Sequence, residues 1–570
     1  MFKITIIDGY IDEPTCLGVP PYISPYPRYI TGSIIKQDKK NQIYYYTIDQ
    51  IRQKNDLSFL TRNHLIIIIA GTSVPGRYLA GYPISPYEIK KLLEHISVKK
   101  ILVGPAAKYG FGMQGGQKTF NSALLKDIFD LIITGDPEIV IKNYLENNLK
   151  IKDINISEKR KNAHTIKEYA NLGSQIVKQH PYYPDYIITE IETYRGCPRT
   201  ITGGCSFCSE PSKGLPDFRP INDIVEEIQN LYIHGIRHFR LGNQPCIFSY
   251  QSIDAGKIEF PRPNPDALQE LFSKIRKVTP ELKTLHIDNA NPGVIARYPK
   301  EAEQIAKTIV KYHTPGDVAA MGVESADPIV IKHNNLKATP EESLKAIKII
   351  NKIGSKRGNN GMPELLPGLN FVFGLEGETK NTFNLNYEFL KHIIDENLLL
   401  RRINLRQVIP IPDTKMYKTS NKLANKHKNL FKKFKNQVKE NIERPMLEKI
   451  LPRATILKNV YTEKHDGKLT FGRQLGSYPL LIGIPGVYNL KLFMDVKIVD
   501  YGYRSITAIP YPLDINIVQR ETIEAIPGIG KKRAIRILAK RPFKTKNDFL
   551  KVFDDPIIAK DVLEFLDFIN

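Results

Sequence analysis

The chain contains the stretch Ile187-Ile-Thr-Glu-Ile-Glu-Thr-Tyr194-Arg-Gly-Cys197-Pro-Arg-Thr-Ile-Thr-Gly-Gly-Cys205-Ser-Phe-Cys208, in which three cysteines follow a strand-like segment. Its first half has the composition of a buried strand, and the glycines and proline after it are typical of a loop. Three thiolates at the carboxyl end of a strand can ligate three irons of a 4Fe–4S cluster, whereas structural clusters normally use four cysteines. The open fourth iron predicts a ligand that binds and reacts there.

Two other interpretations of this loop stay open. A zinc site needs a fourth ligand, which Cys246 or His238 could supply, and structural zinc sites usually show two paired Cys-x-x-Cys units. A disulfide would leave an odd thiol in what is predicted to be a reducing compartment. We favour the cluster, with Cys197, Cys205 and Cys208 as its ligands.

The composition predicts a soluble multidomain protein of the cytoplasm. A length of 570 residues is too great for one core and suggests three or four domains. The chain has only five cysteines, three of them in one loop, so no disulfide framework is expected. The longest apolar stretch, residues 65–70, is too short to cross a membrane, and residues 1–8 lack the features of a secretory signal.

The net charge of the chain is +22, from 82 Lys and Arg against 60 Asp and Glu. Such an excess favours a polyanionic partner, because each neutralised phosphate releases counterions. The alternative is a general bias towards lysine, since Ile, Lys and Asn are frequent throughout the chain. The charge by itself is therefore a weak indication of nucleic-acid binding.

Residues 1–180 are predicted to form a doubly wound, Rossmann-like α/β domain with a parallel sheet. Short β-rich runs alternate there with amphipathic stretches, and each run ends in turn residues. A ligand crevice in such a domain lies at the carboxyl ends of the strands, where the glycine-rich run 109–116 could approach a cofactor or form a surface loop. The predicted strands are residues 3–7, 65–70, 100–103 and 130–134.

Residues 181–415 repeat the order strand, turn, helix six times. Six βα units in succession predict a partial, TIM-like (βα)6 barrel with right-handed crossovers. Catalytic residues in such barrels gather at the carboxyl ends of the strands. The predicted strands are residues 187–194, 238–241, 284–287, 318–323, 369–373 and 402–405.

Three further modules are predicted after the barrel. Residues 416–465 are a lysine-rich helical connector, whose basic face is either solvated or follows RNA. Residues 466–515 are glycine-punctuated and strand-rich, which suggests a small β-barrel. Residues 516–570 contain two apolar helical segments around Gly528-Ile-Gly530, and the cations Lys531, Lys532 and Arg533 follow. Glycines and cations at a helix start are suited to a phosphate.

The cysteine loop and its sequel resemble the radical S-adenosylmethionine superfamily, and within it the tRNA methylthiotransferase branch. The features that carry this resemblance are the aromatic-x-x-Cys loop, Lys213-Gly214, Arg219-Pro220 and Leu241-Gly-Asn-Gln244. The resemblance covers about residues 185–415. One departure is plain, because seven residues separate Cys197 from Cys205 where the family usually has three. The extra residues are expected to loop out.

The resemblance implies the cofactors and several site residues. Cys197, Cys205 and Cys208 would ligate a 4Fe–4S cluster whose open iron chelates S-adenosylmethionine, with an external electron donor. Phe207 would pack near the adenine. Gly242, Asn243 and Gln244 replace the family's Gly-Gly-Glu that faces the methionyl amine, which puts neutralisation of that amine in doubt. Glu324 would contact ribose or amine, and Gly374 belongs to a turn that resembles the adenine-side turn of the family; a helix-start charge is the ordinary alternative for Glu324.

The flanking modules carry resemblances of their own. The N-terminal domain is similar to cobalamin-binding domains, so cobalamin is a possible second cofactor, although the Asp-x-His-x-x-Gly motif is absent and His64 and His95 are not placed to replace it. Methylthiotransferases carry three further cysteines in this domain, whereas this chain has only Cys16, which disfavours methylthiolation. The small β-module resembles TRAM barrels. The tail resembles a helix-hairpin-helix element, with Gly528, Gly530 and Lys531–Arg533 on the nucleic-acid backbone.

These observations predict a radical S-adenosylmethionine enzyme that modifies RNA or DNA. One alternative is a similar enzyme that acts on a small molecule or a protein. The other is a nucleic-acid-binding protein with a structural or sensing cluster. Cys246, which follows the second predicted barrel strand, is either a small buried residue or a catalytic thiol.

Overall fold

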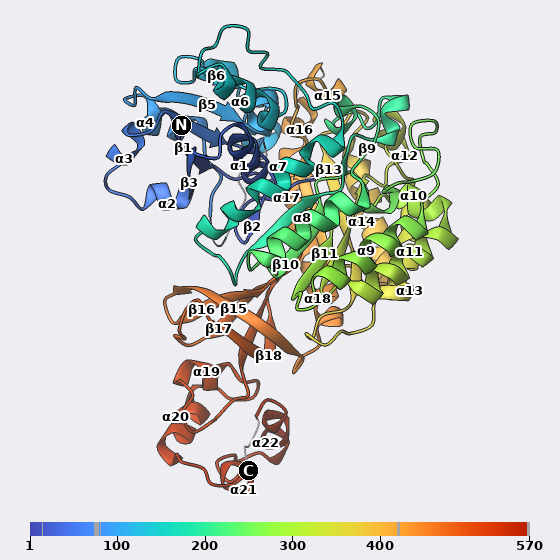
Figure 1. Cartoon of the computed structure of the whole chain (residues 1–570). Coiled ribbons are helices and arrows are strands. Elements are labelled where there is room, and N and C mark those ends of the chain that lie inside the picture. The colour runs from blue at the N-terminus through green and yellow to red at the C-terminus, as the bar shows by residue number, and fades with distance from the viewer. Residues whose placement is uncertain (14, 73–78, 80, 419–421, 567–570) are drawn as a thin grey trace.

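A parallel sheet forms the core of the N-terminal domain in the computed structural model, which describes residues 1–13, 15–72, 79, 81–418 and 422–566 (Figure 1). The sheet has the strand order β3-β1-β4-β5-β6, and all four strand pairs are parallel. This is the doubly wound fold that the sequence predicted. The strands are β1 (Lys3–Asp8), β3 (Gln42–Thr47), β4 (Leu65–Ile69), β5 (Lys99–Val103) and β6 (Leu131–Ile132).

The sequence analysis did not anticipate β3. This strand lies at the edge of the sheet, and exposed and covered positions alternate along it. Its central residues, Tyr44-Tyr-Tyr46, lack the continuous aliphatic character of β4, all of whose residues are buried. Helices α1 (Tyr26–Gln37), α6 (Pro137–Glu146) and α7 (Ile166–Gly173) pack against one another beside this sheet.

The central domain is the predicted partial barrel of six parallel βα units. The strands form two sheets, β11-β10-β7-β2 and β12-β13-β14, and a parallel bridge between Asn289 and Ala320 connects them. Amphipathic helices cover the outside, among them α8 (Ile221–Ile233), α9 (Pro265–Val278) and α13 (Pro340–Gly354). The barrel strands are β7 (Ile188–Glu192), β10 (His238–Gly242), β11 (Thr284–Ile287), β12 (Asp317–Glu324), β13 (Leu365–Phe373) and β14 (Arg402–Gln407).

The first domain does not end cleanly at residue 180, because part of it belongs to the barrel sheet. Strand β2 (Tyr22–Ile23) pairs in parallel with β7 and extends the barrel. Helix α1 is attached to the same place by Arg28, which donates to the carbonyl oxygen of Glu190 at 2.6 Å and pairs with Glu227 of α8 at 2.9 Å. The two domains therefore share one continuous interface.

The lysine-rich connector is helical, as predicted, but shorter. Its principal helices are α17 (Lys428–Val438) and α18 (Arg444–Ile450). Phe431 and Phe434 of α17 lie with their ring centroids 5.0 and 5.1 Å from that of Phe373, so the apolar face of the helix packs against the barrel. Lys428, Lys432 and Lys433 of this helix are exposed.

A closed five-stranded β-barrel follows, with the order β15-β16-β17-β19-β18. It begins at Ile456, before the predicted boundary at residue 466. The prediction placed this boundary too late because β15 carries Lys458, Asn459 and Lys464 on its exposed side and so lacks an apolar composition. Figure 1 shows this barrel below the partial barrel. The strands are β15 (Ile456–Asp466), β16 (Leu469–Gln474), β17 (Leu481–Pro485), β18 (Phe493–Tyr501) and β19 (Ser505–Tyr511).

Short helices form the C-terminal part, below the β-barrel in Figure 1. Helices α19 (Arg520–Ala525) and α20 (Lys531–Lys540) flank the turn that contains Gly528, and α21 (Lys546–Leu550) and α22 (Pro556–Leu563) follow. Their buried residues form a separate apolar cluster that also includes Val499 and Ile509 of the β-barrel. Within the described residues, no helix combines the length and the apolar character that a membrane span requires.

We predict that Glu227 is essential for the stability of the domain interface. Its carboxylate pairs with Arg28 and, at 2.7 Å, with Arg219, and all three side chains are fully buried. Glu227→Ala leaves two buried guanidinium groups without their counter-charge, so we expect a loss of about 3–5 kcal/mol in the free energy of unfolding. Urea denaturation followed by circular dichroism measures this loss.

The neighbouring Glu226→Ala is the matched control. The Glu226 side chain is 44% exposed and lies 3.1 Å from Lys167, so its loss should cost less than about 1 kcal/mol. Equal effects of the two substitutions would contradict the role given to the buried ion pairs.

Candidate active site

The cysteine loop is an ordered surface structure after β7. Cys197 precedes a short 3-10 helix (Pro198–Thr202), and the amide of Cys197 donates to the carbonyl oxygen of Gly214 at 3.0 Å, which closes the base of the loop. Gly203 and Gly204 both have positive φ, and a Cβ on Gly204 would lie 2.3 Å from Cγ of Pro211. The additional residues between the first two cysteines therefore form one helical turn and a tight glycine turn.

The three thiols lie close enough to influence one another electrostatically. Burial raises the pKa of the Cys197 thiol to about 12, and the nearby Cys205 adds to this shift. Burial, followed by the charge of Cys205, likewise raises the pKa of Cys208. Thiols of this kind ionise when a metal centre binds them, and the binding then releases protons. Three free thiols on one loop are the donor set that an iron–sulfur cluster requires.

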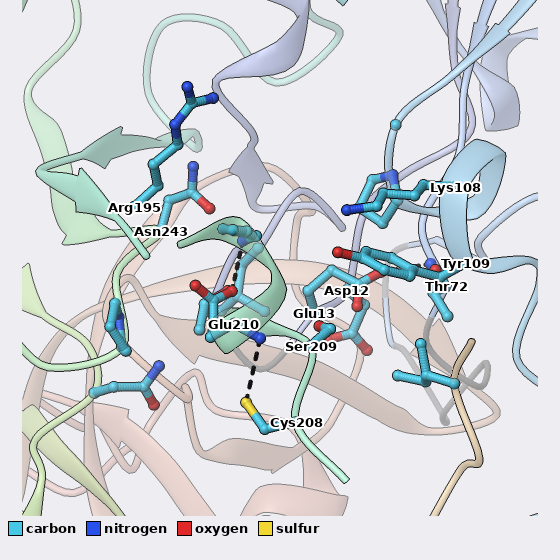
Figure 2. Close-up of a pocket in the computed structure, with 18 of the residues that line it drawn as sticks. Asp12, Glu13, Thr72, Lys108, Tyr109, Arg195, Cys208, Ser209, Glu210 and Asn243 are labelled. Atoms are coloured by element: carbon cyan, nitrogen blue, oxygen red, sulfur yellow. Dashed lines mark hydrogen bonds and ion pairs between the residues drawn. The ribbon is translucent and has the colours of Figure 1, made fainter. Parts of the chain in front are cut away.

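Cys205 and Cys208 line a cavity of about 400 Å³ to which three parts of the chain contribute. Figure 2 shows Asp12, Glu13, Thr72, Lys108 and Tyr109 of the N-terminal domain on one side of the cavity, facing Cys208, Glu210, Arg195 and Asn243 of the barrel. The N-terminal residues follow the carboxyl ends of β1, β4 and β5. Parallel strands of the N-terminal domain and of the barrel therefore end at the same cavity.

An ion pair between a buried carboxylate and a partly exposed lysine forms part of the cavity wall beside the cysteines. The Lys337 ammonium lies 3.5 Å from the Glu324 carboxylate. Burial alone would lower the pKa of Lys337, but the Glu324 carboxylate and two neighbouring cysteines raise it above its ordinary value. Burial raises the pKa of Glu324. Lys337 is therefore a fixed positive charge close to the thiols.

The backbone around this pair is specialised. Glu324 has a φ of 66°, in the left-handed region, at a register shift between β12 and β13. A Cβ on Gly322 would lie 2.0 Å from Oε1 of Glu324 and 2.3 Å from Nζ of Lys337. The absence of a side chain at Gly322 thus creates the space that the ion pair occupies. Strained non-glycine residues are frequent at functional sites.

Several residues predicted from the sequence line this cavity. Phe207, Asn243 and Glu324 do so together with Cys205 and Cys208. Phe207 packs on the small apolar cluster that includes Leu336 and Val408. Asn243 has a φ of 52° and donates through Nδ2 to Glu192 at 2.7 Å.

Four predicted residues of the barrel do not line this cavity: Cys197, and three residues that are packed into neighbouring structure. Gln244 is fully buried and accepts a hydrogen bond from Thr193 at 3.2 Å, because the chain turns inward after β10. Gly242 leaves room for the buried Glu190 carboxylate, which a Cβ would meet at 1.8 Å. Gly374 donates its amide to Glu378 at 2.6 Å and packs against Ala424.

The structure also places residues in the cavity that sequence reasoning missed. Arg402, Asn404 and Arg406 occupy alternate positions of β14 and line the cavity together. The alternation of polar and apolar residues in Arg402-Ile-Asn-Leu-Arg-Gln407 is the signal that could have identified them, because one face of a strand repeats every second residue. No such pattern could identify Lys337, because it lies in a loop after a short helix, where the sequence has no regular period.

A residue of the small β-barrel also reaches the cavity. The turn before β17 inserts into the partial barrel, and Tyr478 donates from its hydroxyl to Asp288 at 3.2 Å. The Arg402 guanidinium lies 3.8 Å from the centroid of the Tyr478 ring. The sequence assigned this turn to a separate module, so its place in the site could not be foreseen.

The two side chains considered as a fourth zinc ligand have other contacts. His238 begins β10, at the end of the barrel away from the cysteine loop, and its Nδ1 lies 2.8 Å from the Thr284 hydroxyl. Cys246 is buried, and its sulfur accepts a hydrogen bond from the amide of Asn291 at 3.1 Å. Among the described residues, no group of three or more His, Cys, Asp and Glu side chains is arranged around one metal ion. A 4Fe–4S cluster does not need such an arrangement, because each cysteine ligates a different iron of the cluster.

The fold and this loop together define an α/β enzyme with a partial barrel, and comparisons with known proteins specify the class. Residues 191–390 match the radical SAM superfamily. An uncharacterised protein of Methanocaldococcus jannaschii is 50% identical over 511 residues, which cover 89% of this chain and 92% of that protein. An uncharacterised protein of Archaeoglobus fulgidus is 43% identical over 94% of this chain and 95% of its own length.

A more distant relative has an assigned activity. The ribosomal protein uS12 methylthiotransferase RimO of Carboxydothermus hydrogenoformans is 25% identical over 193 residues, which cover 33% of this chain and 37% of RimO. This chain belongs to the radical SAM superfamily and is an enzyme of that class. The superfamily uses a 4Fe–4S cluster and S-adenosylmethionine.

Two solved structures match this chain over most of its length. The radical S-adenosylmethionine methyltransferase TsrM of Kitasatospora setae, with cobalamin and a 4Fe–4S cluster bound, is 12% identical, covers 73% of each chain and gives a TM-score of 0.43. The cobalamin-dependent enzyme OxsB is 12% identical, covers 77% of this chain and 56% of OxsB and gives a TM-score of 0.46.

Cobalamin binding by this chain stays a prediction. Asp12, Thr72 and Lys108, which follow β1, β4 and β5, face the cysteine loop across the cavity, which is where a ligand of this domain would lie. His64 is distant from that edge, because it precedes β4 and its Nδ1 accepts from the amide of Lys3 at 2.9 Å. The His95 side chain is 89% exposed.

Proposed function

We propose that this enzyme holds a 4Fe–4S cluster on Cys197, Cys205 and Cys208 and cleaves S-adenosylmethionine reductively in the adjoining cavity. The observation that supports this most directly is the convergence of the cysteine loop and the Glu324–Lys337 pair on one cavity. When bound, the cluster supplies one electron to the sulfonium of S-adenosylmethionine, which yields methionine and a 5′-deoxyadenosyl radical.

The residues of the chain bind and orient the reactant. The Lys337 ammonium lies near the cysteines and suits the methionyl carboxylate, while the Glu324 carboxylate suits the amine or a ribose hydroxyl. Phe207 adds an apolar surface for the adenine. Residues of three modules line the cavity, and they shield part of it from bulk water.

We expect the anaerobically reconstituted protein with dithionite to produce 5′-deoxyadenosine from S-adenosylmethionine. Cys205→Ala should reduce this product at least a hundredfold, because the cluster loses one of its three ligands. Cys246→Ala is the matched control and should retain most of the activity, since Cys246 lies outside the loop. Liquid chromatography quantifies the product. No product from the unsubstituted protein, or equal product from Cys205→Ala, would contradict the proposal.

The space at Gly322 gives a second prediction. Gly322→Ala would displace the Lys337 ammonium and the Glu324 carboxylate, so we expect affinity for S-adenosylmethionine to fall about tenfold, which corresponds to about 1.4 kcal/mol. Equilibrium dialysis with labelled S-adenosylmethionine measures the change. Gly483→Ala is the control, because its Cβ would meet its nearest neighbour at an ordinary 3.6 Å. If Gly322→Ala binds S-adenosylmethionine with unchanged affinity, the ion pair is not part of the binding site.

We propose further that the substrate is a nucleic acid. Three features support this: the net charge of +22, the polar face of β14 with Arg402 and Arg406 in the cavity, and the exposed Lys531 and Lys532 at the start of α20. The turn before α20 contains Gly528 at a φ of 84°, and Arg533 donates to the Gly528 carbonyl oxygen at 2.9 Å. A glycine turn and cations at a helix start support binding of a phosphate backbone here.

The salt dependence of binding tests this part of the proposal. In filter binding to a tRNA transcript, the slope of log affinity against log salt should decrease by about 1–2 when Lys531 and Lys532 are both changed to Gln. Changing Lys300 and Lys307, two exposed lysines of α11 (Pro299–Tyr312), to Gln is the control and should leave the slope unchanged. The same titration with duplex DNA shows whether the protein prefers RNA or DNA. Identical slopes for both double variants would favour a small-molecule or protein substrate.

A further inference from the structure

The cysteine loop contains one buried cation whose hydrogen bonds are directed at the cluster site. Arg199 is 3% exposed and follows Cys197 by two positions. Its Nη1 donates to the Cys205 sulfur at 3.0 Å. Its Nε donates to Oε1 of Glu259 at 2.7 Å, and its Nη2 donates to the carbonyl oxygen and Oδ1 of Asn335 at 2.8 and 3.0 Å. All three guanidinium nitrogens are therefore fixed.

The additional residues of the loop are built around this guanidinium. Asn335 donates through Nδ2 to the carbonyl oxygen of Gly204 at 3.0 Å, and the Thr202 hydroxyl donates to Oε1 of Glu259 at 2.9 Å. Both partners of Arg199 thus also hold the longer span between the first two cysteines. The Phe260 ring lies 5.5 Å from the guanidinium carbon and covers its face. The longer span gives the side chain of Arg199 a rigid, largely dry position beside Cys205.

A hydrogen bond to a cluster sulfur and a nearby charge are two of the quantities that set the potential of an iron–sulfur centre. The reduced cluster carries one more negative charge than the oxidised cluster. A cation 3.0 Å from a ligand sulfur therefore stabilises the reduced state more, and low exposure to water strengthens the effect. The carboxylate of Glu259 opposes it, because this negative charge lies against the same guanidinium.

We propose that Arg199 is a positioning residue that raises the reduction potential of the cluster through its N–H···S bond to Cys205, and that Glu259 moderates this effect. The inference rests on the proposed cluster. Arg199 itself contacts the cysteine sulfur and acts on the electron transfer through it. The electron comes from an external one-electron donor of low potential, so the role of Arg199 is to bring the cluster within reach of that donor.

The test measures the midpoint potential of the cluster by a redox titration followed by electron paramagnetic resonance. Arg199→Gln keeps an N–H donor and removes the charge, and at a fixed donor potential it should lower the ratio of reduced to oxidised cluster about tenfold, which is about 59 mV for one electron. The midpoint potential of Arg199→Lys should lie between that of the unsubstituted protein and that of Arg199→Gln. Glu259→Gln should shift the potential in the opposite direction, because it removes the opposing charge.

The two directions separate tuning from mere support of the loop. If Arg199 only held the loop together, loss of Arg199 or of Glu259 would loosen the same contacts and shift the potential the same way. Shifts of equal sign, or no shift in Arg199→Gln, would overturn the inference. Iron is counted in every variant first. If Arg199→Gln binds no iron, the direction of the potential shift in Glu259→Gln tests the inference instead. If Glu259→Gln also binds no iron, the two residues have a structural role and the inference is overturned.

These results are distinguishable from failure of the proposed function. A wild-type protein without a cluster would refute the proposed function and end the test. A wild-type protein whose cluster cleaves S-adenosylmethionine, with unchanged potentials in the variants, would refute only the role of Arg199.

Discussion

The carboxyl ends of the parallel strands of the first two domains face a shared cavity. This arrangement depends on a buried interface in which Arg28 and Arg219 share the carboxylate of Glu227 and β2 extends the barrel sheet. Turn residues follow the carboxyl ends of parallel strands, so polar and ionisable side chains of both domains collect around the cavity. The site therefore combines ionisable side chains that come from two different domains.

Electrostatics within the cavity are set by charges that the fold keeps fixed. Lys337 beside Glu324 and Arg199 beside Cys205 place two cations next to the thiols. Such a setting favours an anionic cluster, because nearby cations stabilise the negative charge that a cluster brings to this site. Gly322 and the two glycines of the cysteine loop serve the same end, since they permit backbone and side-chain positions that a Cβ would obstruct.

The sequence predicted the strands whose residues are buried on both faces, and the six barrel strands lie in the predicted order. It missed β3, an edge strand, and placed the start of the β-barrel too late, because half-exposed strands have mixed composition. The cysteine loop was recognisable because three cysteines follow a strand-like segment, although the first spacing is longer than the family's. Lys337 and Tyr478 were not, because they reach the cavity only through contacts between segments far apart in the chain.

The central claim is that the cysteine loop holds a cluster with one coordination position open to the cavity. Electron paramagnetic resonance of the anaerobically reconstituted, dithionite-reduced protein tests it most directly, with spectra recorded before and after addition of S-adenosylmethionine. We expect the signal of a reduced 4Fe–4S cluster whose g-values change on addition, because the reactant binds the open iron. A protein without an iron signal, or a signal that S-adenosylmethionine leaves unchanged, would contradict the account.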